Sequence, residues 1–395
     1  MKKFEDMGLS PSLIDATKRL GFTNPTEIQE KSIPPIMAGK DVIGKSATGS
    51  GKTFAFGCGI FERLEFNQKV QALVVTPTRE LTQQVRDELG KIARKKDINI
   101  VAIYGGVGIK PQMKDLNRAD IVVATPGRLL DHMERGTINT SNIKILVLDE
   151  ADRMFDMGFI DDIRKIIQAC PKERQTLLFS ATISERVRGL SKRYMNSPVE
   201  AKGEDMVDPT KLQQVYYGTQ ENLKLTLLAN LLRREKSGLI MVFCNTRRAT
   251  DFVAKTLKSN GVSAIGIHGG LTQSRRSRTM DMFNGAKVGV LVCTDVAARG
   301  LHIEDVSHVY NYNVPKDPND YVHRIGRTAR AGKNGKVVNL LSNADNHSFS
   351  SIRREYPEFK IERKEVPELE RIQVAKVEKK FYKSKFKPRG RKFHR

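Results

Sequence analysis

Cysteine is scarce in this sequence, and its four residues stand far apart. Cys58, Cys170, Cys244 and Cys293 form no Cys-x-x-Cys pair, which argues against a zinc knuckle or a disulfide framework and favours a reducing cytoplasm. Long apolar runs are also missing, since no stretch approaches the ~18 residues of a membrane span. Residues 1–6 lack the apolar core of a signal peptide. We therefore expect a cytoplasmic protein with no membrane partner.

Acidic residues are the minority charge. The sequence holds 45 Asp+Glu against 68 Lys+Arg, a formal net charge of +23. Such an excess favours polyanionic partners, nucleic acid first and an anionic membrane surface second, although a cytosolic protein can also simply be basic. Hydrophobic residues at 39% and charged residues at 29% are typical of a soluble globular protein. A length of 395 residues predicts two or three domains.

Short apolar runs rich in β-branched residues recur along the chain, each followed by a helical pattern. This alternation predicts an α/β fold with a parallel sheet covered on both faces. Ligand residues in such sheets lie just past the carboxyl ends of the strands. The pattern breaks around residues 196–209 and then restarts, so one architecture is used twice. The predicted strands are 72–75, 100–103, 121–124, 145–148 and 177–179, then 239–243, 263–267, 289–293, 307–312 and 336–341.

Residues 46–53 form a glycine-rich turn between an apolar run and a predicted helix. Gly49 and Gly51 carry no Cβ, so backbone N–H groups can approach phosphate oxygens, and the following helix adds the positive end of its dipole. Lys52 can reach the β- and γ-phosphates, and the Thr53 hydroxyl can ligate Mg²⁺. The alternative is an ordinary Gly/Ser turn before a helix. The candidate nucleotide-binding residues here are Ser46, Ala47, Thr48, Gly49, Ser50, Gly51, Lys52 and Thr53.

Two acids follow the buried strand predicted at residues 145–148. Ionised side chains beside a core strand are costly unless they meet a cation or a polar ligand. With a phosphate loop upstream, Asp149 is the expected Mg²⁺ partner, and Glu150 can orient and polarise the attacking water. The alternative is a helix N-terminus rich in acids, which is common.

Arginines gather in the second half, most densely in residues 323–330. On a helix, Arg327 and Arg330 lie three residues apart and share a face. Two guanidinium groups on one face repel each other unless a polyanion lies between them, and a triphosphate from the facing domain would serve. A solvated basic helix face explains the same residues, and this segment alone does not decide between the two.

The C-terminal residues are strongly basic. Residues 371–395 hold 11 Lys+Arg against one acid, Glu378, and four aromatic residues are interleaved. Basic side chains bind phosphates without sequence preference, and aromatic rings can stack on unpaired bases. We expect a tail that is disordered when free and that retains RNA. A tail that only aids solubility is the alternative.

Taken together and in this order, the motifs resemble those of the DEAD-box RNA helicases, a group of superfamily two helicases, from Phe4 to about residue 360. Residues 21–29 are similar to the family's adenine-recognising Q motif. Residues 47–53 are similar to its motif I, and residues 149–152 to the motif that gives the family its name. The resemblance implies ATP and Mg²⁺ as cofactors, catalysis by Lys52, Asp149, Glu150, Arg327 and Arg330, metal binding by Thr53 and Asp149, and nucleotide contacts from Phe4 (stacked on adenine), Phe22, Gln29 and Gly300 beside the phosphate loop.

The same resemblance implies that RNA is held by its sugar-phosphate backbone, largely without sequence preference. The implied RNA-binding residues are Pro77, Thr78, Arg79, Gly105, Gly106, Thr125, Pro126, Gly127 and Arg128 in the first half, and Asn245, Thr246, Gln273, Arg276, Thr294 and Asp295 in the second. The residues implied to couple ATP to RNA are Asp152, Ser180, Thr182 and His323.

The resemblance further implies two tandem RecA-like domains on either side of a cleft. We expect the first at residues 1–202, a linker at 203–211, the second at 212–362 and the basic RNA-binding tail at 363–395. The Q motif would lie at residues 2–30. Three positions depart from the family pattern: Ser46 replaces Ala, Ala329 replaces Gly, and His302 replaces an acid near the ribose.

The implied function is an RNA-stimulated ATPase that locally unwinds short RNA duplexes or remodels ribonucleoproteins, acting as a monomer. An ATP-dependent RNA clamp with little unwinding would use the same motifs. A DNA helicase of the same superfamily is a third possibility, and the Q motif argues against it. The physiological RNA is not predicted.

Overall fold

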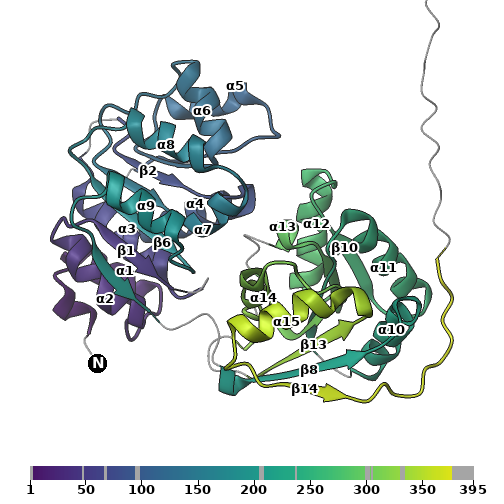
Figure 1. The fold of residues 1–395 in the computed structure, drawn as a ribbon. Coiled ribbons are helices and arrows are strands. Elements are labelled where there is room, and N and C mark those ends of the chain that lie inside the picture. Colours follow the sequence, from purple (N-terminus) through teal and green to yellow (C-terminus); the bar gives the residue numbers. More distant parts are fainter. Residues whose placement is uncertain are drawn as a thin grey trace, which may run out of the picture.

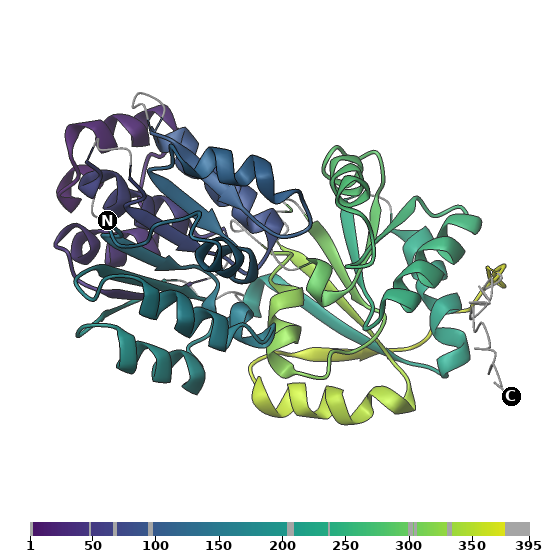
Figure 2. The same cartoon turned by 90° about the horizontal axis from the view of Figure 1, so that it is seen from above.

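The computed structural model consists of two α/β domains, each built on one seven-stranded parallel sheet (Figure 1). It describes residues 3–46, 49–65, 69–93, 98–203, 209–235, 238–298, 303, 306–329 and 334–375. Figure 2 shows the two domains from above, the first in purple to blue and the second in green to yellow. The predicted α/β architecture, used twice, is confirmed.

The first sheet has the strand order β3-β4-β2-β5-β6-β1-β7. Every residue of β2, β4 and β5 is buried, as expected for central strands whose two faces are both covered by helices. Its strands are β1 Val42–Lys45, β2 Ala72–Val75, β3 Ile100–Ile103, β4 Ile121–Ala124, β5 Ile145–Leu148, β6 Gln175–Ser180 and β7 Val199–Lys202. Its helices are η1 Phe4–Met7, α1 Pro11–Arg19, α2 Glu27–Met37, α3 Lys52–Arg63, α4 Arg79–Ala93, α5 Ile109–Leu116, α6 Pro126–Glu134, α7 Ala151–Asp156, α8 Ile160–Ala169 and α9 Glu185–Tyr194.

The second sheet has the order β10-β11-β9-β12-β13-β8-β14, which matches the first position by position. Thus β9 corresponds to β2, and β10 to β3. Its strands are β8 Leu212–Gly218, β9 Leu239–Phe243, β10 Ala264–Ile267, β11 Val290–Cys293, β12 Val306–Asn311, β13 Gly335–Leu341 and β14 Ile361–Lys364. Its helices are η2 Pro209–Lys211, η3 Glu221–Leu223, α10 Lys224–Arg234, α11 Arg247–Ser259, α12 Gln273–Asn284, α13 Asp295–Ala298, α14 Pro318–Ile325, η4 Asn343–Asp345 and α15 Asn346–Glu355.

Residues 365–375, here called the C-terminal strap, run from β14 along α10 and α11 (Figure 1). Asn230 exchanges two hydrogen bonds of 3.0 Å with the main chain of Glu370, and Asn260 exchanges bonds of 2.7 and 2.9 Å with that of Gln373. Leu369 packs against the apolar core beneath the strap. The basic tail was expected to begin at residue 363, and its portion from 376 onward lies outside the described residues.

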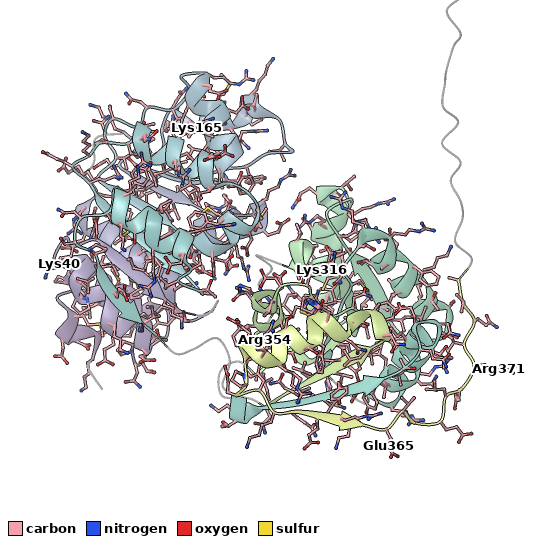
Figure 3. The ribbon with its side chains drawn as sticks, viewed as in Figure 1. Lys40, Lys165, Lys316, Arg354, Glu365 and Arg371 are labelled. Carbon is pink, nitrogen blue, oxygen red and sulfur yellow. The ribbon has the colours of Figure 1, made fainter. Side chains whose placement is uncertain are left out.

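Charged side chains cover the exterior of both domains. In Figure 3, Lys165 on α8 and Arg354 on α15 point outward, as do Glu365 and Arg371 on the strap. Among the described helices, none combines the length and the apolar character that crossing a membrane requires.

Candidate nucleotide site and nucleic-acid interface

The phosphate loop joins β1 to α3, as the sequence predicts. Gly49 and Gly51 have φ angles of +85° and +88°, a region that glycine enters without strain. Lys52 begins α3, is 6% exposed and donates to the Ser46 carbonyl at 3.4 Å. Thr53 follows it in the first helical turn. The loop therefore presents a lysine and a helix N-terminus at one end of the first sheet, which suits a phosphate group.

The start of α2 is fastened to this loop. Thr26 Oγ1 donates to the Ser50 carbonyl at 2.7 Å, and Gln29 Nε2 donates to the Gly51 carbonyl at 3.1 Å. Gln29 Oε1 in turn accepts from the Thr26 N–H at 2.9 Å. A Cβ on Gly51 would come within 2.4 Å of Gln29 Nε2, so only glycine allows this approach. The glutamine predicted to recognise the base thus also sets the shape of the phosphate loop.

Three phenylalanines lie beside the loop. Phe22 is 40% exposed and meets Phe54 edge-on with ring centroids 5.2 Å apart. Phe4 meets the same ring at 5.7 Å but is only 3% exposed. The expectation that Phe4 stacks on adenine does not fit this burial. Phe4 supports Phe54, which supports Phe22, and Phe22 offers the exposed ring.

Asp149 and Glu150 follow β5 and are both buried. Asp149 Oδ1 lies 4.0 Å from Lys52 Nζ; burial raises the pKa of Asp149 to about 6, and the lysine opposes this rise. Glu150 has a φ of +53° and accepts from Arg153 Nη1 at 2.8 Å. Burial pushes its pKa upward, but Arg153, Lys52 and Arg327 outweigh burial and hold the pKa below its usual value. Because Arg327 belongs to the second domain, both domains contribute to the field at this carboxylate.

Asp152, Ser180 and Thr182 form one hydrogen-bonded network between α7 and the end of β6. Asp152 Oδ2 accepts from the Thr182 N–H at 2.8 Å and from its hydroxyl at 3.0 Å. The Asp152 N–H donates to Ser180 Oγ at 3.2 Å, and that hydroxyl donates to the Thr182 carbonyl at 2.8 Å. The structure therefore brings together three of the four residues predicted to couple ATP to RNA. The fourth, His323, is buried on α14 of the second domain.

The predicted RNA residues of the first domain lie past the carboxyl ends of β2, β3 and β4, which are neighbours in the sheet. Residues 104–108, here called the first glycine turn, contain Gly106 with a φ of +81°. A Cβ on Gly106 would come within 2.1 Å of Arg79 Nη1, so the guanidinium of Arg79 lies directly over the turn. The residues at these strand ends are Pro77, Thr78 and Arg79, Gly105 and Gly106, and Thr125, Pro126, Gly127 and Arg128.

The second domain repeats this arrangement with Arg247 and His268, which were not among the predicted RNA-binding residues. Arg247 begins α11, and its guanidinium is 3.5 Å from a Cβ built on Gly269. His268 binds Asp251 through Nε2 at 2.9 Å and accepts from the Gly270 N–H through Nδ1 at 3.0 Å. The first domain has its counterpart in Tyr104, whose hydroxyl accepts from Gln83 at 2.6 Å. The Gly-Gly pair that follows corresponding strands, at residues 105–106 and 269–270, is the sequence signal that could have revealed this match.

Several predicted RNA residues use their polar groups inside the protein. Arg324, 1% exposed, donates to both oxygens of Asp295 at 2.6 and 2.7 Å and to Asn245 Oδ1 at 3.0 Å. Thr246 caps α11 by accepting from the Ala249 N–H at 3.1 Å. Thr294, which ends β11 beside Asp295, is 8% exposed.

Gln273 and Arg276 contact the first domain. Arg276 Nη2 lies 3.0 Å from Glu80 Oε1, and Gln273 Nε2 donates to the same oxygen at 3.3 Å. Glu80, which follows Arg79 on α4, was not among the predicted site residues. Ala47, Thr48, Gly300, Arg330 and the unusual His302 lie outside the residues that the structure describes.

Comparisons with known proteins point to one family. The family model described as DEAD/DEAH box helicase matches residues 26–190, and the model described as helicase conserved C-terminal domain matches residues 223–332. The DEAD-box ATP-dependent RNA helicase CshA of Geobacillus kaustophilus is 44% identical over 374 residues, which cover 94% of this chain and 80% of that protein. The ATP-dependent RNA helicase CshA of Listeria monocytogenes is 45% identical over 345 residues, or 86% and 66% of the two chains.

Solved structures extend the match to the arrangement of the domains. S. cerevisiae Dbp5 bound to RNA and ADP BeF3 is 29% identical and superposes with a TM-score of 0.82 over 93% of this chain and 96% of that chain. A DEAD box protein from Methanococcus jannaschii is 40% identical but has a TM-score of 0.54 over 92% and 99% of the chains. The structure with the higher sequence identity therefore superposes less well on this chain. The present placement is close to that in the Dbp5 complex.

Proposed function

Because the chain belongs to the DEAD-box family of ATP-dependent RNA helicases, we propose that it hydrolyses ATP to ADP and phosphate when RNA is bound. The work done is the separation of short RNA duplexes or the remodelling of RNA–protein complexes. The observation that carries this proposal is that charged residues of both domains act on one carboxylate, that of Glu150. Lys52 lies beside the acids of the first domain, and the charge of Arg327 reaches Glu150 from the second. A site completed by both domains makes turnover depend on their closure.

In this proposal ATP lies over the phosphate loop with its adenine against Phe22. The Gln29 amide keeps one free N–H and one free lone pair beyond its bonds to Gly51 and Thr26, and these can read the two polar positions of an adenine edge. Backbone N–H groups of residues 49–53 and the Lys52 ammonium hold the phosphates.

Mg²⁺ fits the oxygen donors of this site. The Thr53 hydroxyl and the Asp149 carboxylate would hold the ion, with phosphate oxygens and water as further ligands. No group of three or more His, Cys, Asp and Glu able to hold a metal occurs within the described part of the chain. When bound, Mg²⁺ supplies charge neutralisation at the phosphates.

Catalysis is assigned to three side chains that the structure describes. Glu150, kept ionised by its cationic neighbours, accepts a hydrogen bond from the attacking water and orients it in line. Lys52 and Arg327 stabilise the negative charge that spreads over the transferred phosphoryl group. Arg330 would act beside Arg327. The network of Asp152, Ser180 and Thr182 links the segment that carries Asp149 and Glu150 to the end of β6. In this proposal it couples the state of the nucleotide to RNA binding.

The RNA backbone is proposed to lie across both glycine turns, the first at residues 104–108 and the second at 268–270. Main-chain N–H groups of such turns and the flanking Arg79 and Arg247 suit phosphate oxygens. Contacts of this kind carry no base information, so binding is tolerant of sequence. Arg128, Asn245 and Asp295, whose side chains are engaged internally, brace this surface.

The decisive experiment measures ATP turnover with and without single-stranded RNA, and separation of a short RNA duplex with ATP or a non-hydrolysable analogue. We expect RNA-stimulated turnover, which Glu150→Gln abolishes while ATP binding persists. Separation with the analogue as well as with ATP identifies closure as the unwinding step and hydrolysis as the release step. Equal stimulation by single-stranded DNA would contradict the assignment to RNA.

We propose that the protein works in the cytoplasm as a monomer and that ribonucleoproteins are among its partners. The basic residues from 376 onward are proposed to retain RNA through phosphate contacts. Light scattering of the purified chain tests the monomer, and a concentration-dependent dimer contradicts it.

A further inference from the structure

One buried side chain, Gln112 on α5, joins two of the segments proposed to bind RNA. It is 6% exposed. Its Nε2 donates to the Tyr104 carbonyl at 3.1 Å, at the start of the first glycine turn. Its Oε1 accepts from Arg128 Nη1 at 3.0 Å and from His132 Nε2 at 3.1 Å, both on α6. A single amide therefore fixes the turn after β3 to the helix after β4.

The neighbours of this amide leave it one orientation. His132 is fully buried, and its Nδ1 lies 2.7 Å from Thr137 Oγ1. Burial, and then the charge of Arg128, lower the pKa of His132 against the opposing effect of Asp131. The neutral ring then donates from Nε2 to Gln112, and its Nδ1 shares the Thr137 hydroxyl with the His132 carbonyl, to which that hydroxyl donates at 3.0 Å. A flipped amide would set its NH₂ group against two N–H donors, which is unfavourable in a buried site.

Arg128 completes the hold on the turn. Its Nη2 donates to the Val107 carbonyl at 3.1 Å, while Gln112 holds the Tyr104 carbonyl at the other end. The Arg79 guanidinium lies over Gly106. The turn is thus held at both ends and on one face. Both end contacts involve Gln112, which bonds the Tyr104 carbonyl directly and holds the Arg128 guanidinium that bonds the Val107 carbonyl.

We propose that Gln112 is a positioning residue for RNA binding, which together with Arg128 holds the first glycine turn in the geometry that receives the RNA backbone. The proposal rests on the RNA-dependent activity proposed above. The hydrogen bonds of Gln112 join the first glycine turn to α6, so its effect falls on RNA affinity. A turn whose carbonyls are released must be reordered by RNA on binding, and this cost weakens the complex. The kcat for ATP hydrolysis at saturating RNA is unaffected.

The test compares Gln112→Leu with Gln71→Leu in the full chain. Gln71 is also buried, at 1% exposed, and exchanges bonds of 3.0 and 2.6 Å with the main chain of Glu65. It precedes β2 and so lies at the opposite end of the same sheet. Loss of thermal stability should be similar in the two variants. The readouts are the RNA concentration that half-activates ATP turnover, kcat at saturating RNA, and KM for ATP.

We expect Gln112→Leu to raise the half-activating RNA concentration about tenfold, with kcat and KM for ATP within about twofold of the original chain, and Gln71→Leu to leave all three unchanged. An equal rise in both variants, or a fall in kcat without a rise in the RNA requirement, overturns the positioning role. Absence of RNA stimulation in the unmodified chain overturns the proposed function itself.

Thr137→Val provides a second, milder variant if Gln112→Leu does not fold. It removes the hydroxyl that contacts the His132 ring at 2.7 Å and donates to the His132 carbonyl at 3.0 Å. The expected rise in the RNA requirement is about threefold, again with kcat and KM for ATP unchanged, and no rise contradicts the proposal.

Discussion

Glu80 of the first domain and Arg276 of the second form an ion pair, with Oε1 and Nη2 3.0 Å apart and each side chain 16% exposed. Gln273 donates to the same carboxylate. Both second-domain residues lie in the first turn of α12, and Glu80 lies in the first turn of α4. Gln273 and Arg276, to which the family resemblance assigns RNA binding, therefore also join the two domains beside the proposed RNA path. Domain closure and RNA binding thus share side chains.

Reversal of this ion pair tests its part in closure. Glu80→Lys and Arg276→Glu should each raise the RNA concentration that half-activates ATP turnover. The double variant should recover most of the loss, because opposite charges again face each other. A partly buried pair contributes about 1 kcal/mol, or roughly fivefold in half-activation. Asp161→Lys, which breaks an exposed pair on α8, is the control. Losses that simply add in the double variant contradict the coupling.

The first glycine turn should not tolerate a side chain at residue 106. Gly106→Ala combines a φ of +81° with a contact of 2.1 Å to the Arg79 guanidinium, whereas Gly136→Ala has a φ of +64° and open space around the new methyl group. Both variants carry a strain of roughly 1–2 kcal/mol. Only Gly106→Ala should also weaken RNA binding, measured by fluorescence anisotropy of a labelled strand. Equal RNA affinities of the two variants would show that the first glycine turn is not part of the RNA site.

Arg327 should act on turnover and not on nucleotide binding. Replacement by alanine removes a charge that acts on Glu150 and that would stabilise the transition state. ATP turnover at saturating RNA should fall on the order of 10³-fold, as for other arginines inserted from a second domain. Arg354→Ala, on the exposed face of α15, is the control. The assignment fails if equilibrium binding of a labelled ATP analogue is lost while turnover per bound ATP is unchanged.

The strap and the basic residues beyond it should have separable roles. A chain that ends at Lys364 loses the bonds of Asn230 and Asn260 and the packing of Leu369, and its second domain should lose roughly 2–4 kcal/mol of unfolding free energy in urea. A chain that ends at Ala375 should unfold as the full chain does but bind RNA more weakly and with a shallower salt dependence. Equal urea midpoints in the two shortened chains would contradict a stabilising strap.

Local pattern was enough to predict most of the strands, the phosphate loop and the position of the acids after β5, because periodicity and turn chemistry act over a few residues. It missed β7, β8 and β14, which form one edge of each sheet. Local pattern could not test the expectation that the side chains of Asn245 and Asp295 bind RNA. Their partner Arg324 is 79 and 29 residues distant in the sequence, and only folding brings it between them. The burial of Phe4 and the three contacts of Gln112 are set by tertiary packing in the same way.

Asp295 therefore offers the sharpest test of an internal against an RNA-facing role. Asp295→Asn leaves the Arg324 guanidinium, 1% exposed, without its charge partner. An uncompensated buried charge costs about 3–5 kcal/mol, which urea unfolding of the second domain should reveal. Asp281→Asn, an exposed acid on α12, should change nothing. Arg324→Met in combination with Asp295→Asn should recover part of the loss, since the stranded charge is gone. If Asp295→Asn unfolds at the original urea concentration and instead binds RNA more weakly, the side chain faces RNA and the bracing role is wrong.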